Sequence, residues 1–325
     1  RYDMKERITD KKWFVYALVP LCALCWGFSY LGITVTLKSL EPIQLLAMRW
    51  TVSALIFLLL AACRVIKIQY KGKDIKLVLT VGILQPCIYS IFETVGVKLT
   101  TTSESSIFIA TIPLMVLIIG SVILHKKNSR RTILAIIMAF AGVVICVAFS
   151  PNFSIGGKGL DYLILFCAVL TGAFYTYSSS KAAEQFDAVE VTFSISVMGG
   201  IFFNCVSFAM GYGLSGYRAC LTDIKLLIGV LFLGICCSCL CYLIFNFVLG
   251  KLPTAIGTNL VTNSTTAVGV ISGCVFAGDP FGWYTVAGVA LTITGVCLSS
   301  LGNKELTEPA AEADAGPMAE IAEGK

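Results

Sequence analysis

The chain has 325 residues, of which 57% are apolar and only 13% are charged, with a formal net charge of +5. Soluble domains carry about 25% charged residues, so this composition excludes an ordinary soluble globular protein. Apolar segments of about 20 residues, enough to cross a lipid bilayer, recur along the sequence and predict an all-α polytopic membrane protein.

Ten membrane-spanning helices are predicted, separated by Pro, Gly and charged residues. In chain order they cover residues 13–35, 44–65, 75–97, 103–124, 131–149, 160–183, 188–211, 226–249, 254–277 and 281–302. The first five spans form one unit, residues 13–149, and the last five form a second, residues 160–302. Residues 1–12 form an amino-terminal tail. Residues 303–325, rich in Ala and Glu, predict a disordered tail, part of which is consistent with residues added by an expression vector.

Basic residues predict the orientation of the spans. Five Lys or Arg precede the first span, five lie in residues 63–76 and four in residues 125–131. The alternate loops of this half hold only Lys38, Lys98 and Lys158. Because cytoplasmic loops are enriched in Lys and Arg, the amino terminus is expected in the cytoplasm. With ten spans, the carboxyl terminus is expected there too.

One segment of the sequence returns 153 positions later. Tyr89-Ser-Ile-Phe-Glu93 corresponds to Tyr242-Leu-Ile-Phe-Asn246, and Lys98 to Lys251. Each copy has five spans, an odd number, so the second copy enters the membrane from the opposite face. Inverted repeats of this kind form transporters that expose a central site to each side in turn. The sequence therefore predicts two inverted five-helix repeats that work by alternating access.

Glycines, prolines and a few charged or aromatic residues form a pattern of short motifs within and between the spans. They are Trp26-Gly27, Glu41-Pro42, Arg49, Pro113, Gly142, Gly278-Asp279-Pro280 and Gly295. In this pattern the chain resembles the EamA module of the drug/metabolite transporter superfamily, over about residues 13–302. The resemblance implies ten helices, a place in the cell membrane and transport of small metabolites, often outward.

Two charged side chains, Arg49 and Glu93, lie well inside predicted spans, away from the span edges. A charge in hydrocarbon costs about 3 kcal/mol or more, so each needs a partner or water. Both lie about four or five residues from the outer end of their span, and we expect an ion pair or a shared polar cluster. Glu104 is a competing partner for Arg49. The pair is interpreted either as a gate or proton-coupling site or as a static tie. Since Glu93 corresponds to Asn246, no equivalent ionic contact is predicted at the inner face.

Polar and aromatic side chains of several spans are expected to face one central cavity. Gln85, Tyr89 and Glu93 recur at every fourth position and therefore share one face of a helix. The candidate substrate-binding residues are Trp26, Tyr30, Gln85, Tyr89, Tyr175, Ser238, Tyr242, Asn259 and Asn263. Packing or helix–helix contact is the alternative role for Trp26, Gln85 and Asn263. A cavity of this kind suits amino acids, amines or choline-like cations, whose ammonium groups bind aromatic faces.

Other classes of function find little support in the residues. The chain lacks a His-Glu-x-x-His sequence, a Walker motif and an intramembrane Asp pair, so no enzyme is predicted. The 14 cysteines lie almost all in apolar segments, where Cys acts as a small apolar residue, and neither a metal nor a cofactor is expected. No nucleic-acid partner is expected. A channel and a receptor are lower-ranked alternatives.

The sequence thus predicts a multi-pass secondary transporter of the plasma membrane that moves a small organic solute, by preference an exporter of amino acids or related metabolites. The alternative is proton-coupled uptake of a small metabolite, an amine or a choline-like cation. The expected partners are the solute, the lipid bilayer and, in the alternative, a proton. Both a monomer and a homodimer agree with the sequence.

Overall fold

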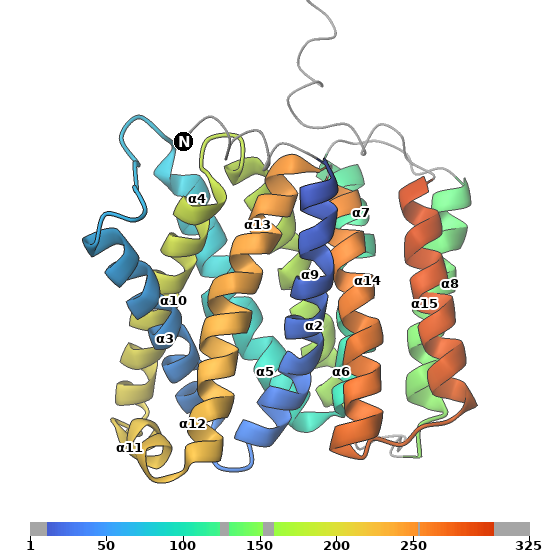
Figure 1. Ribbon diagram of the computed structural model, residues 1–325. Coiled ribbons are helices and arrows are strands. Elements are labelled where there is room, and N and C mark those ends of the chain that lie inside the picture. The colour runs from blue at the N-terminus through green and yellow to red at the C-terminus, as the bar shows by residue number, and fades with distance from the viewer. Residues whose placement is uncertain (1–11, 124–129, 152–158, 253, 302–325) are drawn as a thin grey trace, which may run out of the picture.

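The computed structural model describes residues 12–123, 130–151, 159–252 and 254–301, and within these ranges every regular element is a helix (Figure 1). The predicted all-α class is therefore confirmed for the described residues. The tails expected at residues 1–12 and 303–325 lie outside them, apart from Lys12.

The helices follow the predicted spans closely, and η marks a π-helical segment. The first half contains α2 (Lys12–Thr36), α3 (Pro42–Ala62), α4 (Ile75–Gly82), η1 (Ile83–Tyr89), α5 (Ser90–Leu99), α6 (Thr102–Ile109), α7 (Ile112–Ile123) and α8 (Arg130–Ala148). The second half contains α9 (Gly159–Ala182), α10 (Ala188–Ala209), α11 (Ser215–Thr222), α12 (Ile224–Leu231), η2 (Phe232–Cys241), α13 (Tyr242–Lys251), α14 (Thr254–Ser272), η3 (Gly273–Ala277) and α15 (Trp283–Leu301).

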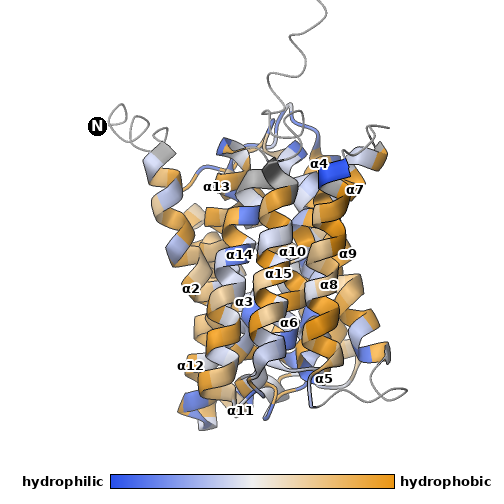
Figure 2. Ribbon diagram, turned by 90° about the vertical axis from the view of Figure 1, so that its right-hand side faces the viewer, coloured by the Kyte–Doolittle hydropathy of each residue, from blue (hydrophilic) through white to orange (hydrophobic). Residues whose placement is uncertain are grey.

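Eight of the described helical stretches are long and apolar enough to cross a membrane. They are Trp13–Thr36, Pro42–Ala62, Ile75–Leu99, Thr102–Val122, Gly159–Ala182, Ala188–Ala209, Ile224–Lys251 and Gly257–Ala277. Two further apolar helices, Ile133–Ala148 and Trp283–Leu298, are shorter. Hydrophobic residues cover most of the length of the helices, and hydrophilic ones gather mainly at the two ends of the bundle (Figure 2). Ten crossings and the cytoplasmic side of the termini stay predictions.

The first and last described helices fix the two ends of the bundle. α2 begins and α15 ends at the same end, here called the upper end (Figure 1). α2 ends and α3 begins at the opposite, lower end. The charge bias of the loops makes the upper end the expected cytoplasmic face.

Side-chain caps define where several helices begin. Asp74, Thr101, Asp187 and Asp223 each accept a hydrogen bond from a backbone N–H in the first turn of α4, α6, α10 and α12, respectively. Such a cap satisfies a backbone donor that has no partner within the helix, and is worth about 1 kcal/mol. Loops at both ends of the bundle are therefore tied to the helices that follow them.

Proline and glycine account for one helix break and one close helix contact. Pro113 lacks an N–H, and the helix breaks just before it, between α6 and α7, where the Thr111 hydroxyl donates to the carbonyl of Phe108 at 2.6 Å. Gly142 of α8 and Gly295 of α15 let these two helices approach closely. A Cβ at either position would lie 2.6 Å from a backbone carbonyl oxygen of the neighbouring helix.

π-helical segments lie at corresponding places in the two halves. η1 separates α4 from α5, and η2 separates α12 from α13. Pro86 lies inside η1, where the missing N–H removes one bond of the regular helix. Tyr89 is the last residue of η1 and Tyr242 follows η2 directly, so the repeated tyrosine sits at this junction in each half.

Candidate functional site

A small cavity, with about 50 Å³ of space for the centres of water-sized molecules, lies between helices of the two halves. Its walls come from α2, η1, α5, α6 and α7 of the first half and from α9, α13 and α14 of the second. The lining residues are Trp26, Ser29, Tyr30, Tyr89, Glu93, Ile109, Ile112, Gly172, Tyr175, Thr176, Tyr242, Phe245, Thr262 and Thr265. Small-molecule sites are mostly apolar with a few polar groups, as is the lining here.

Aromatic rings form much of the wall. The Trp26 ring lies 5.1 Å from that of Tyr242 and 5.3 Å from that of Phe245, centroid to centroid. The Trp26 indole N–H donates to the carbonyl of Cys237 at 3.1 Å, so the plane of the ring is fixed. Tyr175 packs against Tyr242 and Phe245 from the α9 side, with centroids 6.2 Å away in each case. Trp26 therefore both packs and faces the cavity.

Glu93 is the only charged side chain among the lining residues, and it is paired with Arg49 as predicted. Arg49 Nη1 lies 3.7 Å from Glu93 Oε2, with side chains only 2% and 9% exposed. The Arg49 Nε donates to the Ser238 hydroxyl at 2.5 Å, and the Tyr89 hydroxyl donates to Glu93 Oε1 at 2.9 Å. The expected ion pair is confirmed. Whether it serves as a gate stays a prediction.

Glu104 does not compete for the arginine. Its carboxylate accepts the backbone N–H of Thr101 at 3.1 Å and the hydroxyl of Tyr162 at 3.2 Å.

The contact between Arg49 Nη1 and Glu93 Oε2 is longer than a normal hydrogen bond, and neither atom has a hydrogen-bond partner among the described residues. The pair is therefore an electrostatic contact with spare hydrogen-bonding capacity on both sides.

Gln85 and Ser238 lie deeper than the cavity wall. Ser238 of η2 is fully buried and serves Arg49. Gln85 of η1 is also fully buried, and both polar atoms of its amide lack a hydrogen-bond partner in the described part of the chain. Neither residue lines the cavity, so the cavity gives no support to their predicted contact with substrate.

α14 turns a different face to the cavity than predicted. Asn259 Nδ2 donates to the Val296 carbonyl of α15 at 3.0 Å, and Asn263 Nδ2 donates to Asn259 Oδ1. These two amides join α14 to α15. Thr262 and Thr265 line the cavity instead. The two threonines are three residues apart on one helix, so both hydroxyls lie on one face.

Asn246 occupies the position that corresponds to Glu93, and it makes neutral contacts instead of an ion pair. Its Oδ1 accepts the hydroxyls of Tyr175 at 3.0 Å and Ser179 at 2.8 Å, and its Nδ2 donates to Thr192 at 3.0 Å. These bonds connect α9, α10 and α13 beside the cavity. Asn246 thus holds the Tyr175 ring at the cavity wall, a positioning role that was not predicted from the sequence.

Of the predicted substrate contacts, the structure thus gathers five around one cavity: Trp26, Tyr30, Tyr89, Tyr175 and Tyr242. The predicted gating residue Glu93 joins them at the wall. The other eight lining residues were not predicted as site residues: Ser29, Ile109, Ile112, Gly172, Thr176, Phe245, Thr262 and Thr265.

Comparison with known proteins gives a consistent family. The model of the EamA-like transporter family matches residues 13–148 and again residues 160–301. The uncharacterized transporter YcxC of Bacillus subtilis is 22% identical over 305 residues, which cover 90% of this chain and 95% of that protein. An uncharacterized transporter of Archaeoglobus fulgidus is 24% identical over 286 residues, covering 88% and 97%. One protein of known crystal structure, 15% identical, has a similar fold, with a TM-score of 0.60 over 88% of this chain and 97% of that one.

Proposed function

The chain belongs to the EamA-like transporter family, and we propose on this premise that it is a secondary transporter that moves a small organic solute across the cytoplasmic membrane by alternating access. It is a multi-pass membrane protein, as its family and its apolar helices require. In the proposal it exports amino acids or related metabolites.

The observation that carries this proposal is the position of the cavity. It lies between the two matched stretches of the chain and takes its walls from both, so movement of one half against the other changes its access. Solute sites at the interface of two repeats are the usual arrangement in secondary transporters.

The polar groups of the wall suit the two ends of an amino acid. Glu93 and the aromatic rings attract an ammonium group. The Thr265 hydroxyl is buried and has no hydrogen-bond partner among the described residues, so it is free to donate to a solute carboxylate. Thr262 lies one turn away in the same wall, but its hydroxyl donates to its own helix at Thr258, 2.8 Å away.

A second candidate follows from the same wall, namely proton-coupled uptake of an amine or a choline-like cation. Six aromatic residues and one carboxylate, with no basic side chain among the lining residues, form a suitable environment for an organic cation. In this alternative Glu93 would hold the cation and a proton in turn. The two candidates differ in whether a carboxylate on the solute improves or weakens binding.

Solute flux in proteoliposomes tests both candidates. We expect saturable counterflow of either an amino acid or its decarboxylated amine, each offered at equal concentration. Trp26→Ala should weaken counterflow about tenfold or more, because the aromatic wall is lost. Trp13→Ala is the matched control, since Trp13 is 59% exposed at the start of α2 and should leave flux unchanged. Conductance without saturation, or equal loss in both variants, would contradict the proposal.

A thermal-shift screen supports the flux measurement without needing a driving gradient. A solute at 100 times its Kd adds about 2.7 kcal/mol to the stability of the protein that binds it. The shift should disappear in Trp26→Ala and persist in Trp13→Ala. A shift that persists in both would place the bound solute away from this cavity.

A further inference from the structure

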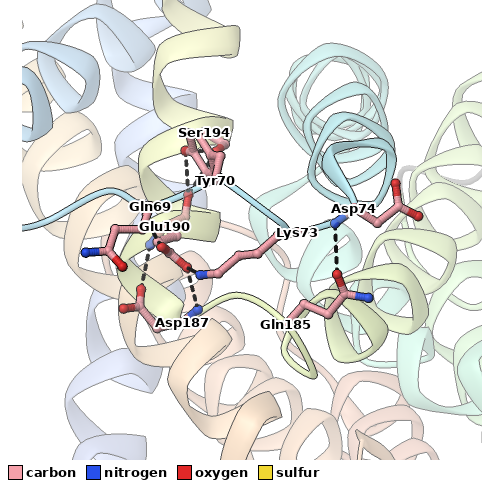
Figure 3. Close-up of polar contacts among 8 residues, drawn as sticks. All are labelled: Gln69, Tyr70, Lys73, Asp74, Gln185, Asp187, Glu190 and Ser194. Atoms are coloured by element: carbon pink, nitrogen blue, oxygen red, sulfur yellow. Dashed lines mark hydrogen bonds and ion pairs between the residues drawn. The ribbon is translucent and has the colours of Figure 1, made fainter.

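A polar network joins the two halves at the upper end of the bundle (Figure 3). Lys73, in the connection between α3 and α4, lies with its Nζ 2.5 Å from Glu190 Oε2 of α10. The backbone N–H of Gln69 donates to Glu190 Oε1 at 3.0 Å. We call these three residues the upper latch. Two more contacts flank it: Tyr70 to Ser194, 2.5 Å between hydroxyl oxygens, and the Asp74 N–H to Gln185 Oε1 at 2.9 Å.

The carboxylate of the upper latch is held firmly by its own helix. Glu190 Oε2 also accepts the backbone N–H of Asp187 at 3.0 Å, and Asp187 accepts the Glu190 N–H at 2.8 Å, which makes a reciprocal helix cap. The Glu190 side chain is only 3% exposed, whereas that of Lys73 is 27% exposed. If the connection moved away, the buried carboxylate would lose its lysine and one backbone donor together.

A corresponding contact at the lower end carries no charge. Gln44 holds the same place in the cap of α3 that Glu190 holds in the cap of α10, and its Oε1 accepts the Glu41 N–H at 2.9 Å. Its Nε2 donates to the Ser215 hydroxyl at 2.7 Å. Ser215 begins α11, in the connection that follows α10, just as Lys73 lies in the connection that follows α3. We call Gln44 and Ser215 the lower latch.

The two latches therefore have the same arrangement. The upper latch joins the cap of α10 to the connection after α3, and the lower latch joins the cap of α3 to the connection after α10. The two contacts are related by the repeat, but one is ionic and partly buried while the other is neutral and exposed. Both are made in the same structure. Opening either end by moving the halves apart must break the latch at that end.

We propose that the upper and lower latches are the paired gates of this transporter, and that the ionic latch makes the upper end the harder one to open. This inference rests on the proposed function, because gates have a role only in a carrier with alternating access. It differs from the expectation drawn from Arg49 and Glu93, which join two helices of the same half. The sequence predicted no ionic contact at the inner face that would be equivalent to Arg49–Glu93. The upper end, the expected cytoplasmic face, does have an ionic contact, between Lys73 and Glu190, which are 117 positions apart.

Charged contacts also cross between the halves at the lower end and must be kept constant, among them the Glu104 carboxylate, which accepts the Tyr162 hydroxyl at 3.2 Å and is unchanged in every variant below. The Asp279 carboxylate accepts the backbone N–H of Ser103 at 2.7 Å. Asp279 is unchanged in every variant below, so the comparison concerns the two latches alone.

Hydrogen exchange of the protein in nanodiscs, with no solute added, tests the proposal. Glu190→Gln gives the upper latch the chemistry of the lower one and keeps an oxygen for the cap. We expect exchange of amides in residues 63–74 to rise roughly tenfold, the effect of losing a charged hydrogen bond. Exchange in residues 210–223 should fall in the same variant, because opening the upper end keeps the lower end closed. Lys73→Gln must give the same reciprocal change, and it leaves the α10 cap intact.

The matched control is Lys98→Gln. It removes the Lys98–Glu41 ion pair, which is 2.6 Å long but lies within one half, and should leave both regions unchanged. Faster exchange at residues 63–74 with no decrease at residues 210–223 would mean local loosening and would overturn the proposal, as would no change at either end. A reciprocal change in exchange, combined with no measurable solute flux in proteoliposomes, would support coupled ends and refute the proposed function. Solute flux without a reciprocal change would refute the latches alone.

Discussion

Removal of one partner of the Arg49–Glu93 pair should destabilise the protein strongly, and removal of both should cost less than the two single losses together. At 3.7 Å and an effective dielectric constant of about 20, the two charges attract each other by about 4 kcal/mol. Glu93→Gln leaves a buried guanidinium without its counter-ion, in contact with Ser238 and with the Trp50 ring 5.8 Å away. Arg49→Met leaves a buried carboxylate that keeps its hydrogen bond from Tyr89. Breaking a buried pair in this way costs about 3–5 kcal/mol.

The double variant has no buried charge left at this place, so we expect a coupling energy of about 2 kcal/mol or more between the two changes. The assay is the midpoint of thermal unfolding of the four proteins in one detergent. Lys98→Gln is the control, because the exposed Lys98–Glu41 pair should contribute less than about 1 kcal/mol. Strictly additive losses would refute the reasoning. Solute flux then separates the two roles: a gate or coupling site regains stability but not transport in the double variant, whereas a static tie regains both.

Three further substitutions test the cavity and the packing. If the unpartnered Thr265 hydroxyl binds the solute, Thr265→Val should raise KM about tenfold without loss of stability. Thr262→Val should change KM less, because that hydroxyl already bonds to its own helix. Equal effects of the two variants in flux assays would contradict this. Asn259→Ala should lower stability by about 1–2 kcal/mol through its lost bond to α15 and leave KM unchanged. Gly142→Ala should destabilise by about 1–3 kcal/mol because of the 2.6 Å contact with a carbonyl, while Gly159→Ala, with open space around it, should not. Thermal unfolding measures both.

The positions of the helices were predictable because long apolar segments have few other stable forms in a bilayer. The Arg49–Glu93 pair was predictable for a related reason, since two isolated charges at similar depth must find each other or water. Both inferences use properties local to a helix, namely length and depth, and need no knowledge of how the helices pack.

The face that α14 turns to the cavity was not predictable in this way. Asn259, Thr262 and Asn263 are three or four positions apart, so their side chains lie on nearly the same side of the helix. Periodicity therefore does not decide which of them faces the cavity. The contact with α15 decides the matter, because the Val296 carbonyl accepts a hydrogen bond from Asn259. The Lys73–Glu190 pair was missed for the same reason, because loop charges acquire partners only through the tertiary arrangement.

A π-helical segment divides one long helix in each half, α4–η1–α5 in the first and α12–η2–α13 in the second, and forms a joint between its two arms. The hydrogen bonds of a π-helical turn span five residues, so the chain is wider there than in the arms on either side. Tyr89 and Tyr242 lie at these joints, and both are part of the cavity wall. A bend at either joint would therefore change the shape of the cavity wall, which is the proposed solute site.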